Sequence, residues 1–130
     1  MKSYWDSSAI VEAWIDRNLR VRLHQERGFT RTHSLAEVFS SLTKGNLEAR
    51  LSADDAAQTV AQFTKDLDFV DLSADEVLAA LSRARAKGVR GGRVHDFLHA
   101  VAAEKAGADK IITLDENDFD DLTGLKIELV

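Results

Sequence analysis

The sequence predicts an α/β protein with a mainly parallel sheet. Short runs of apolar and β-branched residues alternate with longer stretches whose apolar residues recur at helical spacing. This alternation is typical of strand–helix–strand units. The segment from Lys110 to Leu114 is an almost unbroken apolar run, as expected of a strand that is buried on both faces.

The size and composition of the chain predict one globular domain over residues 1–130. Its 130 residues are 45% apolar and 30% charged, with no cysteine, which excludes a disulfide framework and a thiolate site. No apolar run approaches the roughly 20 residues that span a bilayer, and Asp6 comes too early for a signal-peptide core, so we expect a cytoplasmic protein. The net charge of −5 disfavours a basic nucleic-acid coat protein but not a nuclease.

The N-terminal part of the chain contains two predicted strands and the helices between them. Apolar residues at helical spacing follow the first strand, and a glycine ends the next helical stretch. We predict a strand at 2–5, a helix capped by Ser7 or Ser8, a short helix at 19–27 that stops at Gly28, and a strand at 29–33.

Capping residues and glycines divide the rest of the chain. Ser34, Ser52 and Ser73 each precede an amphipathic stretch, and Ser73 with Glu76 has the spacing of a capping box. We predict helices that start near these serines, with the third running from 74 to about 87, then a glycine break, a helix at 94–106, and strands at 69–72, 110–114 and, as an edge strand, 126–130.

Four acidic residues occupy positions that a parallel sheet would bring to one edge. Asp6 and Asp115 directly follow strands, Asp96 lies in the first turn of a helix, and Glu37 lies one turn into another helix. Four converging carboxylates cannot all stay ionised without a cation, and oxygen ligands favour Mg²⁺ or Mn²⁺. Such a site is suited to phosphodiester hydrolysis.

Each of these residues also has a simpler interpretation. Asp6 could cap the helix that follows it, and Glu37 could complete a capping box with Ser34. Asp96 is favourable near a helix start through the helix dipole alone, and Asp115 could be a turn residue before Asn117. Spacing does not separate these interpretations from a metal site.

Four local patterns, in order, resemble the PIN domain, and especially the VapC-like toxins of bacterial and archaeal toxin–antitoxin pairs. The resemblance extends over the whole chain, including Gly124-Leu125 before the last strand. The patterns are Tyr4-Trp5-Asp6-Ser7-Ser8-Ala9-Ile10-Val11, Ser34-Leu35-Ala36-Glu37-Val38, His95-Asp96-Phe97-Leu98-His99-Ala100 and Ile112-Thr113-Leu114-Asp115-Glu116-Asn117-Asp118-Phe119.

The resemblance implies a three-layer α/β/α fold with five strands in the order 3-2-1-4-5. It also implies a Mg²⁺- or Mn²⁺-dependent endoribonuclease, usually a homodimer, which a cognate antitoxin inhibits by wrapping around it. Asp6 and Asp96 would bind the ion directly, while Glu37 would bind through water or act as general base. Asp115, where the family often has Asn, would complete the site or bind a second ion. Support would come from Ser7, Thr113 and Asp118.

A cluster of cations just before Asp96 is the strongest candidate for holding RNA. Five of them fall within eleven residues in a chain whose net charge is negative. They could bind phosphates, or they could simply form a solvated helix end. The members of this basic segment are Arg83, Arg85, Lys87, Arg90 and Arg93.

Two other function classes compete with the nuclease. The first is a catalytically silent PIN-fold module that binds RNA or protein, although all four acidic positions are filled. The second is a phosphatase or phospho-acceptor domain with Asp6 as nucleophile. Such phosphatases typically carry a second Asp two residues on, where this chain has Ser8, and a receiver-like domain would need a Lys late in the sheet, which Lys110 matches poorly.

Overall fold

A five-stranded parallel sheet forms the centre of the protein. The structure is a computed structural model that describes residues 2–45 and 50–130. Every neighbouring pair of strands is parallel, and the order β3-β2-β1-β4-β5 confirms the sequence prediction, with β5 as an edge strand. The strands are β1 (Ser3–Trp5), β2 (Phe29–Arg31), β3 (Asp68–Val70), β4 (Lys110–Thr113) and β5 (Lys126–Leu129).

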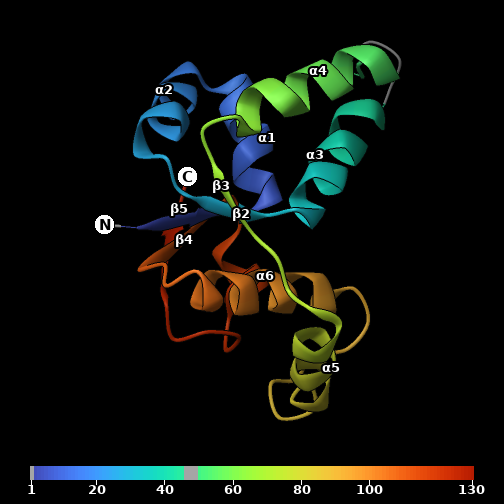
Figure 1. The fold of residues 1–130 in the computed structure, drawn as a ribbon, viewed down its shortest axis with the longest axis vertical. Coiled ribbons are helices and arrows are strands. Elements are labelled where there is room, and N and C mark those ends of the chain that lie inside the picture. The colour runs from blue at the N-terminus through green and yellow to red at the C-terminus, as the bar shows by residue number, and fades with distance from the viewer. Residues whose placement is uncertain (1, 46–49) are drawn as a thin grey trace.

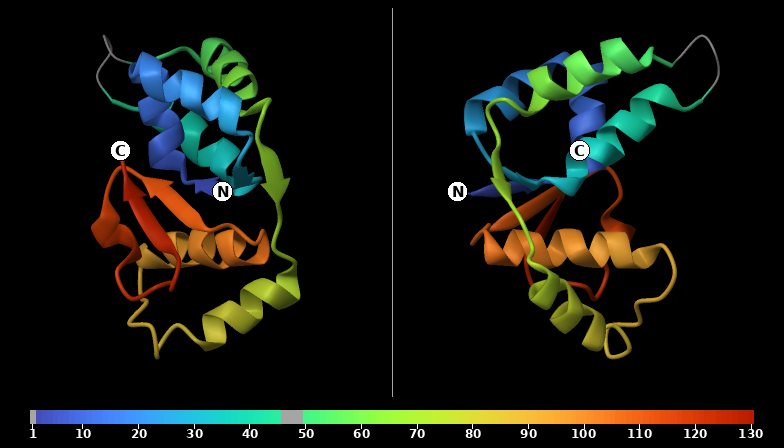
Figure 2. Two further views of the ribbon diagram at one scale, coloured as in Figure 1. Left: turned by 90° about the vertical axis from the view of Figure 1, so that its left-hand side faces the viewer. Right: turned by 45° about the vertical axis from the view of Figure 1, so that its right-hand side comes forward.

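Helices cover both faces of this sheet and complete the three layers that the sequence resemblance implied. Figure 1 shows α1, α2, α3 and α4 on one side of the sheet, with α6 against the other side and α5 beyond it. Figure 2 shows the same layers from two further directions. The helices are α1 (Ser7–Ile15), α2 (Arg17–Glu26), α3 (His33–Thr43), α4 (Ala53–Thr64), α5 (Ala74–Ser82) and α6 (Arg93–Lys105), with a 3₁₀ helix, η1 (Glu116–Phe119).

Successive residues of the two central strands, β1 and β4, point into two different hydrophobic cores on opposite faces of the sheet. Side chains alternate across a strand, so Trp5 and Ile112 belong to the core under α1–α4, whereas Tyr4 and Ile111 belong to the core under α6. All four side chains are fully buried. This two-sided burial explains why the β4 segment reads as an apolar run, and it fixes the ends of β1 and β4 side by side.

Two of the helix starts agree with the sequence predictions, and two others differ from them. Ser52 caps α4, and both hydrogen bonds of the capping box that joins Ser73 and Glu76 are present. Helix α1 is instead capped by Asp6, not by Ser7 or Ser8. Helix α3 begins after Thr32, which makes no capping hydrogen bond, so the prediction that Ser34 opens this helix is wrong.

Two helix ends also lie earlier than predicted. Helix α5 ends at Ser82, and residues 83–88 form turns rather than the predicted continuation to Lys87. Helix α2 ends with Arg27 in the left-handed conformation, at a φ of 50°, so Gly28 is not its left-handed stop. Gly28 is needed because a Cβ there would lie 2.4 Å from the carbonyl oxygen of Ser3, so its missing side chain lets β2 approach β1.

In the part of the chain that the structure describes, no helix has both the length and the apolar character needed to cross a bilayer.

Candidate functional site

The side chain of Asp6 lies at the carboxyl end of β1, where the strand order changes direction between β1 and β4. It is only 4% exposed. Its Oδ1 accepts hydrogen bonds from the backbone N–H of Ala9 at 2.9 Å and from the hydroxyl of Ser8 at 2.7 Å. Asp6 therefore does cap α1, as the simpler interpretation held, and these two bonds occupy both lone pairs of Oδ1.

The second oxygen of Asp6 faces the end of β4. Thr113 Oγ1 donates a hydrogen bond of 2.7 Å to Oδ2, and Thr113 is itself fully buried. Oδ2 keeps one lone pair with no partner among the described residues, so it is the oxygen that is able to bind a cation. The serine that holds Asp6 is Ser8, whereas Ser7 lines a cavity beside Glu37.

Glu37 projects from the second turn of α3 and pairs with a residue that the sequence patterns did not single out. Its Oε1 lies 2.6 Å from His99 Nε2 on α6. Burial disfavours its charge, but the hydrogen bond from His99 and the nearby positive charge of Arg31 outweigh burial, so the pKa of Glu37 is lowered. Because Glu37 bonds His99 and not the backbone of Ser34, the capping-box interpretation of Glu37 is wrong.

Asp96 shows most clearly that the acidic side chains share one electrostatic environment. Burial raises the pKa of Asp96 to about 6, and the negative charges of Asp118, Asp6 and Glu37 act in the same direction, while His99 opposes them. The residues come from four separate parts of the chain. Their mutual influence places Asp6, Glu37, Asp96 and Asp118 around one region at the carboxyl edge of the sheet.

Asp118 and Asp115 differ in their relation to this region. Burial raises the pKa of Asp118, and the charges of Asp115 and Asp6 add to this effect, while Arg93 opposes it. Asp118 is also the largest charged contributor to the raised pKa of Asp96. Asp115 is exposed, and its Oδ1 accepts from the backbone N–H of Asn117, so it caps η1 as a turn residue would.

The donor set fits a hard divalent cation held mainly through water. Among the described residues, no three His, Asp or Glu side chains lie close enough together to hold an ion by themselves. Mg²⁺ usually keeps several waters and binds proteins through only one or two carboxylates, so this spacing is compatible with it. The raised pKa values of Asp96 and Asp118 mark a local excess of negative charge that a cation would neutralise.

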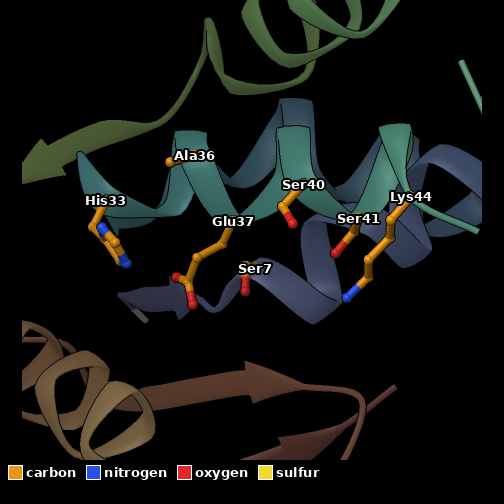
Figure 3. Close-up of a pocket in the computed structure, with 7 residues that line it drawn as sticks. All are labelled: Ser7, His33, Ala36, Glu37, Ser40, Ser41 and Lys44. Atoms are coloured by element: carbon orange, nitrogen blue, oxygen red, sulfur yellow. The ribbon is translucent and has the colours of Figure 1, made fainter. Parts of the chain in front are cut away.

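A polar cavity of about 380 Å³ opens beside Glu37 between α1 and α3 (Figure 3). In Figure 3 the carboxylate of Glu37 and the hydroxyl of Ser7 face this space, with Ser41 further along α3 and Lys44 just after its end. Its lining consists of Ser7, His33, Ala36, Glu37, Ser40, Ser41 and Lys44. The cavity thus runs from an acidic end to a cationic one.

The basic segment that precedes Asp96 is divided by the fold. Arg93 begins α6, donates to the backbone oxygen of Asp120, and lowers the pKa of Asp118, which places it beside the acidic region. Arg83 lies over the ring of Phe97 at 5.8 Å, Arg85 is exposed in a turn, and Arg90 is exposed after it. Within the described part of the chain, Arg93 is the member of the basic segment with a contact that ties it to the site.

The sequence reasoning missed the roles of Ser8, which bonds Asp6, of His99, which bonds Glu37, and of Tyr4, which bonds His99. His99 lies three residues after Asp96, so both share one face of α6, and that spacing was the available signal. The contact between Ser8 and Asp6 was not visible because residues two positions apart do not face each other in a helix, and it forms only because Asp6, as the N-cap, has an extended backbone.

The fold and this region together define a parallel α/β protein with an acidic site at the point where the strand order reverses. The PIN domain family model matches residues 3–125, and the chain belongs to this family. PIN domains are generally nucleases that use divalent metals.

Among solved structures, the chain is similar to VapBC-1 from nontypeable Haemophilus influenzae, with a TM-score of 0.69 and 15% sequence identity. The match covers 99% of this chain and 98% of that one, which shows that the two share a fold. A search of curated proteins found no match.

Proposed function

We propose that this protein is a Mg²⁺- or Mn²⁺-dependent endoribonuclease, the toxin of a toxin–antitoxin pair. Membership of the PIN family supports nuclease activity, and the motifs that resemble VapC-like toxins support RNA as substrate. The observation that carries the proposal is the buried carboxylate of Asp6 at the carboxyl end of β1, which Thr113 at the end of β4 holds with one lone pair of Oδ2 left for a cation. The raised pKa of Asp96, to which burial and three other carboxylates contribute, supports it. Neighbouring carboxylates in such an environment are typical of functional sites.

Asp6 and Asp96 are the residues that we assign to direct metal binding. Oδ2 of Asp6 has a free lone pair and is held in place by Thr113, and Asp96 makes no hydrogen bond with a described residue. Glu37 and Asp118 would bind through water, and Asp115 would contribute at the outer edge. When bound, a divalent ion supplies an acidified water and stabilises charge on a phosphodiester.

The residues of the chain would then perform two tasks. Glu37, ionised because its pKa is lowered, is suited to accept a proton from the attacking water. Asp6 is held by three hydrogen bonds, so it is fixed in one orientation. A carboxylate that accepts so many bonds is a poor nucleophile, which argues against the phosphatase alternative.

We place the RNA strand along the cavity between α1 and α3. The cavity begins at Glu37 and ends at Lys44, so a nucleotide next to the cleaved bond could set its phosphate against the ammonium group. The serine hydroxyls between them can bond to ribose or base edges. Arg93, with the rest of the basic segment, would hold the strand on the other side of the site.

We also propose a cognate antitoxin and a homodimer for this protein, in the cytoplasm. The resemblance to VapC-like toxins supports these proposals, and the shared fold with VapBC-1 is consistent with them.

The proposal is tested by RNA cleavage with purified protein in Mg²⁺ or Mn²⁺, compared with an Asp6→Asn variant. We expect metal-dependent cleavage that the variant loses by at least about a hundredfold. A matched control is Asp68→Asn, because Asp68 is exposed at the start of β3, at the opposite end of the strands. If wild type and Asp6→Asn cleave equally, the activity is a contaminant, and if RNA binds without being cleaved, the chain is a silent binding module.

A further inference from the structure

A buried chain of hydrogen bonds runs from the central strand to Glu37. The hydroxyl of Tyr4 on β1 lies 2.7 Å from His99 Nδ1, and His99 Nε2 lies 2.6 Å from Glu37 Oε1. Tyr4 is fully buried and His99 is 2% exposed. The three residues come from β1, α6 and α3, so the chain of bonds passes from the sheet to helices on both of its faces.

The chemistry of Tyr4 determines which way the bonds point. Tyr4 is fully buried, and burial disfavours the charged phenolate, so its phenol keeps its proton. Its hydroxyl lies 2.7 Å from His99 Nδ1, and the hydroxyls of Ser34 and Thr30 also lie next to it. A phenol that donates to Nδ1 leaves the ring proton of a neutral imidazole on Nε2. That N–H then faces Glu37 Oε1.

We propose that Tyr4 and His99 are positioning residues that fix the tautomer of His99 and thereby the orientation of the Glu37 carboxylate. The expected effect on catalysis rests on the proposed nuclease function. The hydrogen-bond arrangement itself exists without metal or RNA. Both side chains are buried, so they would act on metal and RNA only through Glu37. Their role is to hold Oε1 of Glu37, which leaves Oε2 for the water that the site activates.

The need for such a support follows from the place of Glu37 in the fold. A Glu side chain has several rotatable bonds and loses conformational freedom when it is fixed. Glu37 borders an open cavity, where solvent would let it adopt several rotamers. The bond from a rigid, buried imidazole selects one of them. Partners of this kind commonly change activity tenfold to a hundredfold.

The proton position is measured directly in the metal-free protein. A long-range ¹H–¹⁵N correlation spectrum at neutral pH distinguishes the two neutral tautomers and the doubly protonated ring. We expect the His99 proton on Nε2 in the wild type and loss of this single state in Tyr4→Phe. A proton on Nδ1, a doubly protonated ring, or a spectrum that Tyr4→Phe leaves unchanged would overturn the inference.

Kinetics test the consequence. We expect Tyr4→Phe to lower kcat about tenfold while KM for RNA stays within about twofold, because only the orientation of Glu37 changes. Thr64→Val is the matched control, since it removes the hydroxyl of another buried residue that bonds only within α4. Equal losses of kcat in the two variants would show that any disturbance of the core lowers kcat, which would contradict the proposal.

A second pair of variants covers the case in which Tyr4→Phe fails to fold. His99→Gln keeps an N–H donor on a side chain of similar reach, whereas His99→Leu keeps only the volume. We expect His99→Gln to retain more kcat than His99→Leu, and equal kcat in both would contradict a positioning role. Absence of cleavage by the wild type would instead refute the proposed function, and the tautomer measurement would still stand.

Discussion

Thr113 at the end of β4 donates a hydrogen bond of 2.7 Å to Oδ2 of Asp6 at the end of β1. The two residues are 107 positions apart in the chain, and the parallel register of β1 with β4 brings them together. This bond fixes Oδ2, the oxygen of Asp6 that keeps a lone pair for a cation. The pairing of β1 with β4 therefore both packs the centre of the sheet and positions Asp6 in the acidic site.

Replacing Thr113 with Val should weaken metal binding about tenfold, because Oδ2 of Asp6 loses its orienting donor. The loss of a bond to a buried carboxylate should also cost about 2 kcal/mol of unfolding free energy. Calorimetric titration with Mn²⁺ and urea unfolding measure the two effects. In Thr64→Val, the matched buried threonine, stability should fall without any change in Mn²⁺ affinity, and an equal loss of affinity there would contradict the assignment.

The raised pKa of Asp96 implies a specific dependence of stability on pH in metal-free protein. Between the unfolded pKa of about 4 and the folded value of about 6, the native state holds a proton that the unfolded state has lost. Stability from this group is therefore present below pH 4 and lost as pH rises through 6. Because Asp96 is partly exposed, we expect a loss on the order of 1 kcal/mol after allowing for solvent screening.

The measurement compares wild type with Asp96→Asn in chelator by thermal unfolding from pH 4 to 7. The variant should become the more stable protein as pH rises, and added Mn²⁺ should reverse the order. If the thermal stabilities of the two proteins changed with pH in parallel, Asp96 would not be the group that causes the loss of stability.

Lys44 should contribute one phosphate contact to RNA binding. Single-stranded nucleic acid loses about 0.7 in the slope of log affinity against log salt for each contact removed. We therefore expect Lys44→Ala to flatten that slope by about 0.7, measured by fluorescence anisotropy with RNA in chelator. Lys126→Ala, an exposed lysine on the edge strand β5, is the control and should leave the slope unchanged. Equal slopes in all three proteins would contradict the proposal that the RNA strand lies along this cavity.

An ion-pair network outside the acidic cluster should stabilise the edge of the sheet. Glu128 on β5 pairs with Arg22 on α2 and with Lys110 on β4 at 2.6 Å, and the hydrogen bond from Arg22 is the main reason that the pKa of Glu128 is lowered to about 2. A lowered pKa adds stability above the unfolded value near 4.5, and that stability is lost as pH falls towards 2.

We expect Glu128→Gln to cost about 1 kcal/mol at pH 7, since the network is only partly buried. Urea unfolding at pH 7 and pH 2.5 measures the difference, which should shrink at the lower pH. RNA cleavage should not change. A pH-independent cost would mean that packing, rather than charge, holds the edge strand.

The sequence was sufficient for the strands and for the position of Asp6, because both follow from local patterns and parallel topology. An apolar run such as β4 predicts a buried strand, and a polar residue directly after it must lie at the sheet edge. The resemblance to a known family supplied the strand order. These features depend on few long-range details, which is why they could be predicted.

The partners of the acidic residues could not be predicted in the same way. Glu37 and His99 are 62 positions apart, and their contact depends on how α3 and α6 pack on opposite sides of the sheet. The local pattern from Ser34 to Glu37 favoured a capping box that the structure does not form, because Ser34 is buried and accepts from Thr30 instead. Tertiary packing overrode a local signal there.

The acidic cluster is tested most directly by calorimetric titration of metal-free protein with Mn²⁺. We expect binding in the wild type that is lost in Asp96→Asn and Asp6→Asn, while Asp68→Asn binds as the wild type does. If the wild type takes up no Mn²⁺, or if both site variants bind it with unchanged affinity, these carboxylates do not form a metal centre.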